Sequence, residues 1–339
     1  MAIIQVLHQG SWRAAEVLGV GVAGTLKEVE VLGTRATFTT NGTTFAPRVY
    51  LRSGSAATVE WREGNTLLST SLAPTLTWGS AGTRTITLTC SVPSDVEVLN
   101  FGYDHTEDTG TYMPAASYDY AAQPLTSVAN LQYFSHLKML LASHTPTSGV
   151  LDLTGLSYLE YAECYEAGFT STDLAGCNSL VRLNLESNAL TSLDLNPVRG
   201  TLRDLRFAAQ AGGGVTFASL DGPMVQLYHY CVRSQSVNNI VPLSLLPAIT
   251  QYWVWNTGIT SLATPVSTTL NSLRAYGNAI DQTSIDNVLV WISQNVVGQY
   301  GSTLLDQGTS ATPSATGWSA YDQLDARTNW TVQVNGIHP

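Results

Sequence analysis

A recurring pattern of leucines covers the C-terminal part of the chain and constrains its fold more than any other feature. From about residue 131 the pattern L-x-x-L-x-L-x-x-N-x-L keeps returning, and its clearest copy is LVRLNLESNALTSLDL at 180–195. Other copies begin at Leu156, Leu202, Met224, Ile249 and Leu270, and a more degenerate copy begins at Phe134 or Leu137. Such a short unit cannot bury its own apolar side, so the repeat predicts a stack of units over 131–280.

This pattern and its spacing resemble leucine-rich repeats. The resemblance implies that each unit is a short strand, a turn and a return segment, with the strand leucines pointing inward. An asparagine at the ninth position of a unit can satisfy backbone groups at the bend, and Asn188 and Asn278 fit that role. Cys164 stands at the same position, which argues that it is structural.

The segment 281–339 is expected to close the stack as a small α/β cap. Ile285, Val288, Leu289 and Ile292 share one helical face, and Thr283 with Asp286 resembles a capping box at the start of that helix. A strand, TLLD, follows. Thr312 and Pro313 start a second helix, on which Gly317, Tyr321 and Leu324 share a face, and a last strand, WTVQV, ends the chain.

The run ATPSATGWSAYDQLDARTNWTV resembles a closing segment of leucine-rich-repeat proteins that bacteria and their phages encode. The matching residues are Pro313, Ser314, Gly317, Ala320, Leu324, Ala326, Arg327, Trp330 and Val332, with one extra residue before the tryptophan. This resemblance concerns the cap and carries no chemistry.

Residues 26–105 are expected to form a β-sandwich. The strand-like runs are VEVLG, ATFTT, RVYLRS, ATVEWR, TLLST, TLTWG, TRTITLTCS and VEVLNFG, separated by turn signals. Trp61, Trp78 and the alternating Ile86, Leu88 and Cys90 resemble an Ig-like module of the polycystic-kidney-disease type.

The sequence therefore predicts a mainly β protein, in which an Ig-like sandwich precedes a leucine-rich-repeat solenoid and its cap. Residues 1–25 would form an N-terminal arm or first strands. Residues 106–130 would form a junction between the sandwich and the repeats.

The charge content narrows the range of partners. Charged residues make up 12% of the 339 residues and the net charge is −10, so contacts with nucleic acid and with anionic membrane surfaces are disfavoured. No apolar run is long enough to span a bilayer, and no export signal stands at the start.

Motifs for a cofactor, a metal or catalysis are weak. Residues 19–24 match G-x-G-x-x-G literally, but a strand-like run follows and the expected acidic residue is missing, so we expect no cofactor. The acidic cluster 104–108 is a solvated linker or, as an alternative, a Ca²⁺ site. The four cysteines are buried thiols or include a bridge between Cys164 and Cys177.

One constellation stands out when the repeats are aligned. The outward columns of the predicted strands contain aromatic residues on adjacent units, flanked by arginines, which is typical of a binding surface. The members are Tyr228, Tyr230, Trp253, Trp255, Tyr276, Arg206 and Arg274. In the alternative register, with the fourth unit starting at Val225, Tyr228 and Tyr230 turn inward into the core.

These features favour a non-enzymatic structural or decoration protein of a phage virion, present in many copies. Its repeat surface would bind other virion proteins of the capsid or tail, or a host surface glycan or protein. The alternative is a leucine-rich-repeat adhesin that is secreted or displayed on a bacterial surface. An enzyme acting on polysaccharide is a third reading, for which the sequence offers no motif.

Overall fold

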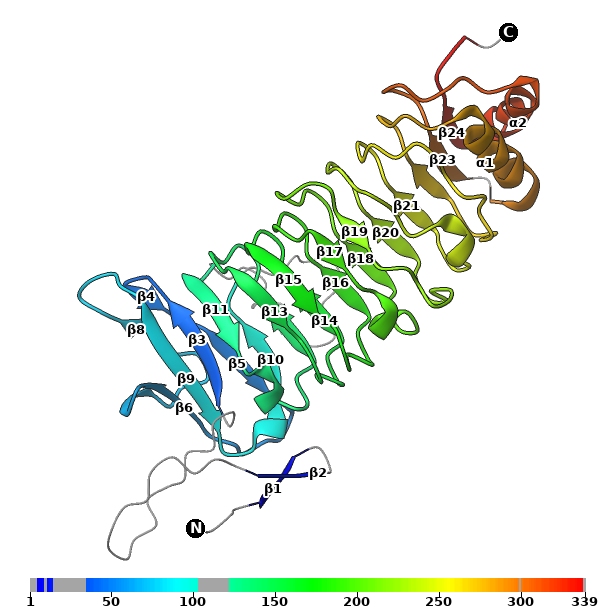
Figure 1. The fold of residues 1–339 in the computed structure, drawn as a ribbon. Helices are drawn as coiled ribbons and strands as arrows, with labels where there is room; N and C mark the ends of the chain where they lie inside the picture. Colours follow the sequence, from blue (N-terminus) through cyan, green and yellow to red (C-terminus); the bar gives the residue numbers. More distant parts are fainter. Residues whose placement is uncertain (1–4, 9–10, 15–34, 103–121, 299, 338–339) are drawn as a thin grey trace, which may run out of the picture.

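The computed structural model describes residues 5–8, 11–14, 35–102, 122–298 and 300–337, and it is mainly β. The molecule is elongated: a five-stranded sheet lies at one end, helices α1 and α2 lie at the other, and an eleven-stranded sheet runs between them (Figure 1). The long sheet is the frame on which the candidate site is built.

The five-stranded sheet is antiparallel and contains four of the eight strands predicted for the N-terminal region. Its order is β11 (Leu125–Ala129), β3 (Ala36–Thr40), β9 (Arg84–Cys90), β6 (Val59–Glu63) and β7 (Thr66–Ser69). Two small sheets pair β4 (Thr44–Phe45) with β8 (Leu76–Thr77), and β1 (Gln5–His8) with β2 (Ser11–Ala14). Along β9 the residues Ile86, Leu88 and Cys90 are buried and alternate with threonines, which is how a strand fits over a core.

Aromatic side chains fill the space beneath this sheet. The Phe38 and Phe101 rings lie 4.7 Å apart, and the Phe45 ring stacks on Phe101 at 6.2 Å. Trp61 is fully buried, and its indole Nε1 donates to the Ser71 carbonyl. The predicted strand VEVLG lies outside the described residues.

The eleven-stranded sheet is parallel except at its first pair. In spatial order it contains β5 (Arg48–Leu51), β10 (Val96–Asn100), β12 (Met139–Leu141), β14 (Tyr161–Glu163), β16 (Arg182–Asn184), β18 (Asp204–Arg206), β20 (His229–Cys231), β21 (Gln251–Trp253), β22 (Ser272–Arg274), β23 (Tyr300–Leu304) and β24 (Asn329–Gln333). From β10 onward each strand pairs with the next in sequence, apart from the strands of the return segments. Strands β5 and β10 thus join the N-terminal region to the repeats in one sheet.

The strand register shows where each repeat begins. The central inward residues pair in a row: Leu140, Ala162, Leu183, Leu205, Tyr230, Tyr252 and Leu273. The residue three positions earlier is buried in every case, so the units start at Leu137, Leu159, Leu180, Leu202, Leu227, Ile249 and Leu270. The predicted starts at Leu156 and Met224 are therefore wrong by three residues. Both units carry an additional buried apolar residue that imitates the start of the pattern.

The return segments contribute short elements on the other side of the core. Strand β13 (Gly149–Asp152) pairs with β15 (Phe169–Asp173), and β17 (Ser192–Leu193) pairs with β19 (Thr216–Phe217). Single 3-10 turns occupy Pro93–Asp95, Leu131–Tyr133, Asn196–Val198 and Leu243–Leu245.

Buried amides connect neighbouring units at the bend after each strand. The Asn188 side chain donates to the Cys164 carbonyl at 2.8 Å and to the Leu185 carbonyl at 2.9 Å, and it accepts from the Phe169 amide at 2.9 Å. Asn278 makes the matching bonds to its own neighbouring units. The predicted role of these asparagines is confirmed.

Glutamines and a threonine occupy the same position in the units between them. The equivalent residues are Gln210, Gln235 and Thr257, each buried and bonded to a neighbouring unit. Cys164 was misplaced by the false start at Leu156: it lies opposite Leu185, as an inward strand residue.

The C-terminal cap contains two helices, α1 (Gln282–Asn295) and α2 (Ala315–Asp325). The predicted face of α1 is confirmed, because Ile285, Val288, Leu289 and Ile292 are all buried. The predicted N-terminal capping residues of both helices are wrong.

The helix caps differ from the predicted ones. Asp281 caps α1 and accepts from the Ser284 amide at 2.8 Å, whereas Asp286 accepts from the Ser314 amide and so ties α1 to the start of α2. Ser314, not Thr312, precedes the first turn of α2. Asp281 and the predicted Thr283 are both residue types that cap helices, and only the geometry selects between them.

All four cysteines are free and buried, so the alternative of a bridge between Cys164 and Cys177 is wrong. No helix among the described residues is long and apolar enough to cross a membrane. The G-x-G-x-x-G run at 19–24 and the acidic cluster at 104–108 lie outside the described residues.

The amide ladder predicts a specific stability loss. Asn188→Ala leaves the buried Cys164 carbonyl and two buried amides without partners, while the Leu185 carbonyl keeps its bond from Gln210, so we expect a loss of about 3 kcal/mol in the free energy of unfolding. Chemical denaturation followed by circular dichroism measures it. Asn271→Ala is the control, because the Asn271 side chain is exposed, and it should change stability by less than about 0.5 kcal/mol. Equal effects of the two substitutions would contradict the role assigned to Asn188.

Candidate binding face

The long sheet has one face turned to the leucine core and one turned away from it. We call the second one the outward face, and the strand register defines its columns. One column contains Tyr161, Arg182, Asp204, His229, Gln251 and Ser272, and the next contains Glu163, Asn184, Arg206, Cys231, Trp253 and Arg274. A third follows just past the strand ends with Tyr165, Glu186, Ala208, Arg233, Trp255 and Tyr276. Polar and aromatic residues therefore occupy the outward face from β14 to β22.

Three aromatic side chains form a ladder across β21 and β22. Trp255 and Tyr276 stack at 5.3 Å between ring centroids with only 12° between their planes. Trp253 lies 5.8 Å from Trp255 and is tilted by 46°. We call Trp253, Trp255 and Tyr276 the aromatic ladder; each is partly exposed.

The faces of both indoles are already in contact with other side chains. The Arg233 guanidinium lies over the Trp255 ring at 5.1 Å, on the neighbouring strand opposite to Tyr276. The Arg274 guanidinium lies over Trp253 at 4.8 Å, and His229 packs edge-on against the same indole at 4.8 Å. Because these faces are occupied, the ladder is held rigidly and offers mainly ring edges to a partner.

A network of charges lies beside the ladder, on β14 to β20. Arg182 Nε lies 2.5 Å from a Glu163 carboxylate oxygen and 3.6 Å from Asp204. Asp204 also lies 3.4 Å from Arg206 Nε, and its other oxygen is 2.7 Å from His229 Nδ1. Arg233 adds a further ion pair with Glu186 at 3.4 Å. Such pairing offsets much of the cost of placing charges out of water.

The network shifts the pKa values of its two most buried acids in opposite directions. Burial raises the pKa of Glu163 from 4.5 to about 7, although Arg182 acts to lower it. Burial also acts to raise the pKa of Asp204, but the hydrogen bond to His229 and the charges of Arg206 and Arg182 outweigh it, so the pKa of Asp204 lies below its ordinary value.

Arg274 differs from the other arginines of these columns. Arg182, Arg206 and Arg233 each have a carboxylate within ion-pair distance, whereas no described carboxylate lies within that distance of Arg274. Its Nε is buried without a hydrogen-bond partner among the described residues, as are the Nε atoms of Arg206 and Arg233, so the missing carboxylate is what sets Arg274 apart. One strand further on, Asp306 Oδ1 is buried and also lacks a partner there. A donor and an acceptor are thus left unsatisfied at the edge of the aromatic ladder.

The face contains no activated nucleophile. Cys231 lies next to His229 on the same strand, but burial and the neighbouring Glu186 raise the pKa of its thiol to about 12, so it is not a thiolate near neutral pH. In the parts of the chain that the structure describes, no three His, Cys, Asp or Glu residues are grouped as a metal site. The arrangement is suited to binding.

The strand register places some residues of the predicted patch on the outward face and others elsewhere. Arg206, Arg274, Trp253, Trp255 and Tyr276 lie in the outward columns, as expected.

The prediction that Tyr230 lies on the surface is wrong. It is fully buried, stacks on Tyr252 at 5.0 Å, and its hydroxyl accepts from the Val241 amide. Tyr228 is exposed but precedes β20 and is not part of the ladder. The alternative register, which turned both tyrosines into the core, was correct for Tyr230 and wrong for Tyr228. The cause is the extra apolar residue Met224, which moved the predicted start of the unit by three residues; a shift by an odd number of residues exchanges the two faces of a strand.

The charge network was not predicted, for two reasons: two units were aligned on the wrong start, and the column that contains Arg182 and Asp204 was not among the columns aligned. His229 and Arg233 belong to the unit that was misaligned at Met224, and Glu163 to the unit misaligned at Leu156. Counting each unit back from the last leucine before its strand, Leu159 and Leu227, would have placed these residues outward.

Comparisons with protein-family models, with curated proteins and with solved structures each find no match. The geometry of the outward face is therefore the basis for the function proposed below.

The raised pKa of Glu163 predicts how stability depends on pH. A carboxyl that holds its proton more tightly in the folded state stabilises the fold fully below pH 4.5, and that contribution is lost as the pH rises through about 7. Glu163→Gln should therefore reduce the fall in unfolding free energy between pH 4.5 and 7, which we expect to be on the order of 2 kcal/mol. Urea denaturation at several pH values measures it.

The matched control for this substitution is Asp173→Asn. Asp173 is exposed, and the amide oxygen of an asparagine can still accept from the Ala175 amide. If Glu163→Gln and Asp173→Asn give the same pH profile as the unsubstituted chain, Glu163 does not titrate in this window.

Proposed function

We propose that this protein is a non-enzymatic binding component of a phage particle and that the outward face of its long sheet holds a partner protein. The observation that carries the proposal is the aromatic ladder with the unpaired Arg274 at its edge. Rigid aromatic residues and arginine dominate binding energy at protein interfaces.

The proposal includes a finer assignment of the fold. Residues 131–280 would be a leucine-rich-repeat solenoid, which the 21- to 25-residue intervals between paired inward residues and the buried amide ladder support. The N-terminal sheet would be an Ig-like sandwich, which its antiparallel order and buried Trp61 support. Such solenoids commonly bind through the exposed sheet.

A protein partner fits the ladder better than a glycan does. A sugar ring packs its C–H groups flat on an aromatic face, but Arg233 and Tyr276 take the two faces of Trp255, and Arg274 lies over Trp253. An interface between proteins can use ring edges, and a carboxylate on the partner would satisfy Arg274.

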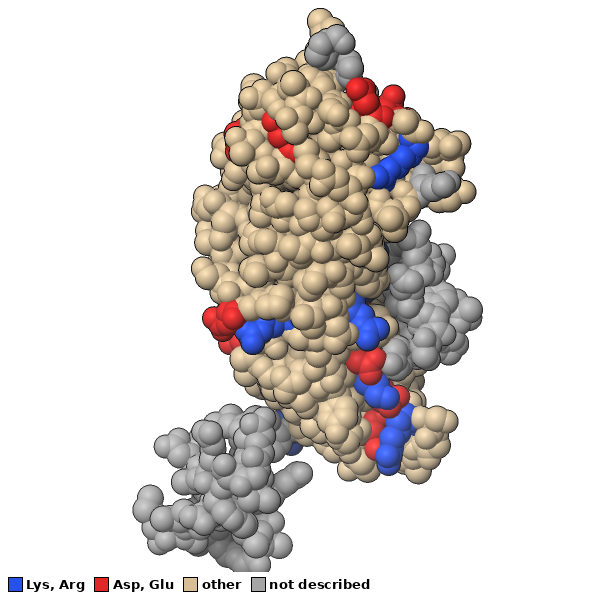
Figure 2. All heavy atoms as spheres, turned by 90° about the vertical axis from the view of Figure 1, so that its right-hand side faces the viewer, with Lys and Arg blue, Asp and Glu red and all other residues tan. Residues whose placement is uncertain are grey.

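The virion assignment rests on the resemblance of the closing segment and on the surface. The space-filling view shows a side of the molecule on which charged residues are few and gathered in narrow patches (Figure 2). A broad uncharged surface suits a protein that packs in an assembly with repeated contacts. The alternative, a bacterial adhesin, shares the binding face and differs in where the chain is found.

Location and face can be tested together. Particles purified from cells that produce the chain should contain it at a fixed copy number by quantitative mass spectrometry. Finding it only in the cell-surface fraction would favour the adhesin, and finding it in neither would reject both.

Arg274→Ala should then lower the copy number on the particle, because a partner carboxylate would lose its ion pair. We expect affinity to fall by about 2 kcal/mol, roughly 30-fold, with little change in melting temperature, since Arg274 has no carboxylate to lose within the described residues. Arg203→Ala is the control, because the Arg203 side chain is exposed and hydrogen-bonds to the Gln226 side chain. Equal copy numbers for the two variants would remove the outward face from the interface.

A further inference from the structure

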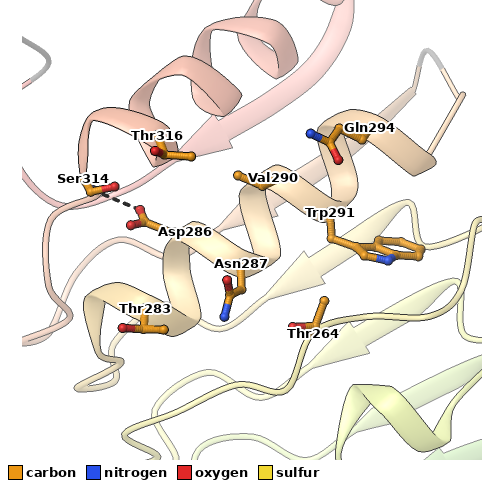
Figure 3. Close-up of a pocket in the computed structure, with 9 residues that line it drawn as sticks. All are labelled: Thr264, Thr283, Asp286, Asn287, Val290, Trp291, Gln294, Ser314 and Thr316. Carbon is orange, nitrogen blue, oxygen red and sulfur yellow. Dashed lines mark hydrogen bonds between the residues drawn. The ribbon is translucent and has the colours of Figure 1, made fainter.

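A groove lies in the C-terminal cap, away from the outward face. Helix α1 forms its floor, the loop at Thr264 forms one wall and the first turn of α2 forms the other, around a cavity of about 450 Å³ (Figure 3). The buried stripe of α1 belongs to the same core as Leu273 of β22, so α1 covers the inner side of the sheet that bears Arg274 on its outer side. The groove and the aromatic ladder therefore face different directions.

The groove is lined by one indole, one carboxylate, Val290 and uncharged polar side chains. Thr283, Asn287, Trp291 and Gln294 follow one another at intervals of four, four and three residues, so they lie on one face of α1. Thr264 and Thr316 contribute hydroxyls from the two walls (Figure 3).

The polar atoms of this lining are available to a ligand. Among the described residues, the side chains of Asn287, Gln294 and Thr316 and the Trp291 indole Nε1 have no hydrogen-bond partner. The groove thus offers two planar side-chain amides beside a half-buried indole whose N–H is free to donate.

The walls are fixed in position. Asp286 Oδ1 accepts from the Ser314 amide at 3.0 Å, which joins α1 to the start of α2 (Figure 3). A Cβ at Gly317 would lie 2.0 Å from that oxygen, so only glycine permits this close approach. The contact uses the one carboxylate of the lining and leaves the indole and the amides free.

The chemistry of the lining selects the class of ligand. No Lys or Arg lines the groove, so nothing there balances a phosphate or a carboxylate. The lining is also too polar for a purely apolar molecule. A pyranose ring matches it, because one face of the ring is apolar and packs on an indole while its hydroxyls bond to amides. We propose that this groove is a binding site for an uncharged saccharide.

The experiment follows the Trp291 indole N–H by NMR in the full-length, ¹⁵N-labelled protein. Trp291→Phe assigns the resonance. The probes are cellotriose, maltotriose and triacetylchitotriose, with inorganic phosphate as the charged comparison. At least one saccharide should shift the Trp291 resonance in a saturable way, and phosphate should not.

Two substitutions that leave the core intact test the lining. Asn287 and Gln294 are exposed, so Asn287→Ala and Gln294→Ala should fold normally, and each should raise the dissociation constant about tenfold. Asn271→Ala and Trp255→Ala should leave saccharide binding unchanged. Trp255 belongs to the aromatic ladder, so its variant separates this site from the proposed partner face.

Three outcomes would overturn the proposal. One is that none of the three saccharides shifts the Trp291 resonance at millimolar concentration. Another is that binding survives both Asn287→Ala and Gln294→Ala unchanged. The third is that phosphate shifts the resonance more than any saccharide does.

Discussion

Burial of the inward row of each unit against the next holds this molecule together. The three-residue strands that carry Leu183, Leu205 and Tyr230 are too short to be stable alone, and each covers its neighbour's apolar side. The same stacking creates buried bends whose backbone groups cannot reach water. The amides of Asn188, Gln210 and Asn278 satisfy those groups across unit boundaries. Apolar burial therefore sets the stack, and the amides fix the spacing within it.

Because the inward residues and the buried amides stabilise the stack, the residues of the outward face can vary. Because strand side chains alternate, a residue such as Trp253 can change without disturbing Tyr252 beside it. Charges at β14 to β20 pair with one another, and the aromatic ladder follows at β21 and β22. Arg274, at the edge of the ladder, differs from Arg182, Arg206 and Arg233 because no carboxylate among the described residues lies within ion-pair distance of it.

Helix α1 of the C-terminal cap has two roles. Helix α1 closes the core with Ile285 and Leu289, and its next face carries Asn287 and Trp291 into the groove. One helix thus ends the stack and supplies a separate surface. The position of α1 depends on Asp286, which accepts a hydrogen bond from the Ser314 amide. The spacing of residues in the sequence does not distinguish this bond from a helix cap.

The sequence by itself determined the mainly β class, the strands of the N-terminal region that the structure describes, the repeating units and the buried face of α1. These follow from periodicity, which is local: strand alternation and the return of leucine every 21 to 25 residues need no knowledge of neighbours. It also placed Trp253, Trp255, Tyr276, Arg206 and Arg274 in the outward columns, because the starts of their units at Leu202, Ile249 and Leu270 were chosen correctly.

Only the tertiary structure decided which face Tyr230 and His229 occupy. An additional apolar residue, Met224, gave that unit two possible starts three residues apart, and a shift by an odd number of residues exchanges the faces of a strand. Pairing of Leu205 with Tyr230 removes the ambiguity, because the hydrogen bonds between neighbouring strands allow one register. The ion pairs of Asp204 and the isolation of Arg274 exist only across strands, so they depend on that register as well.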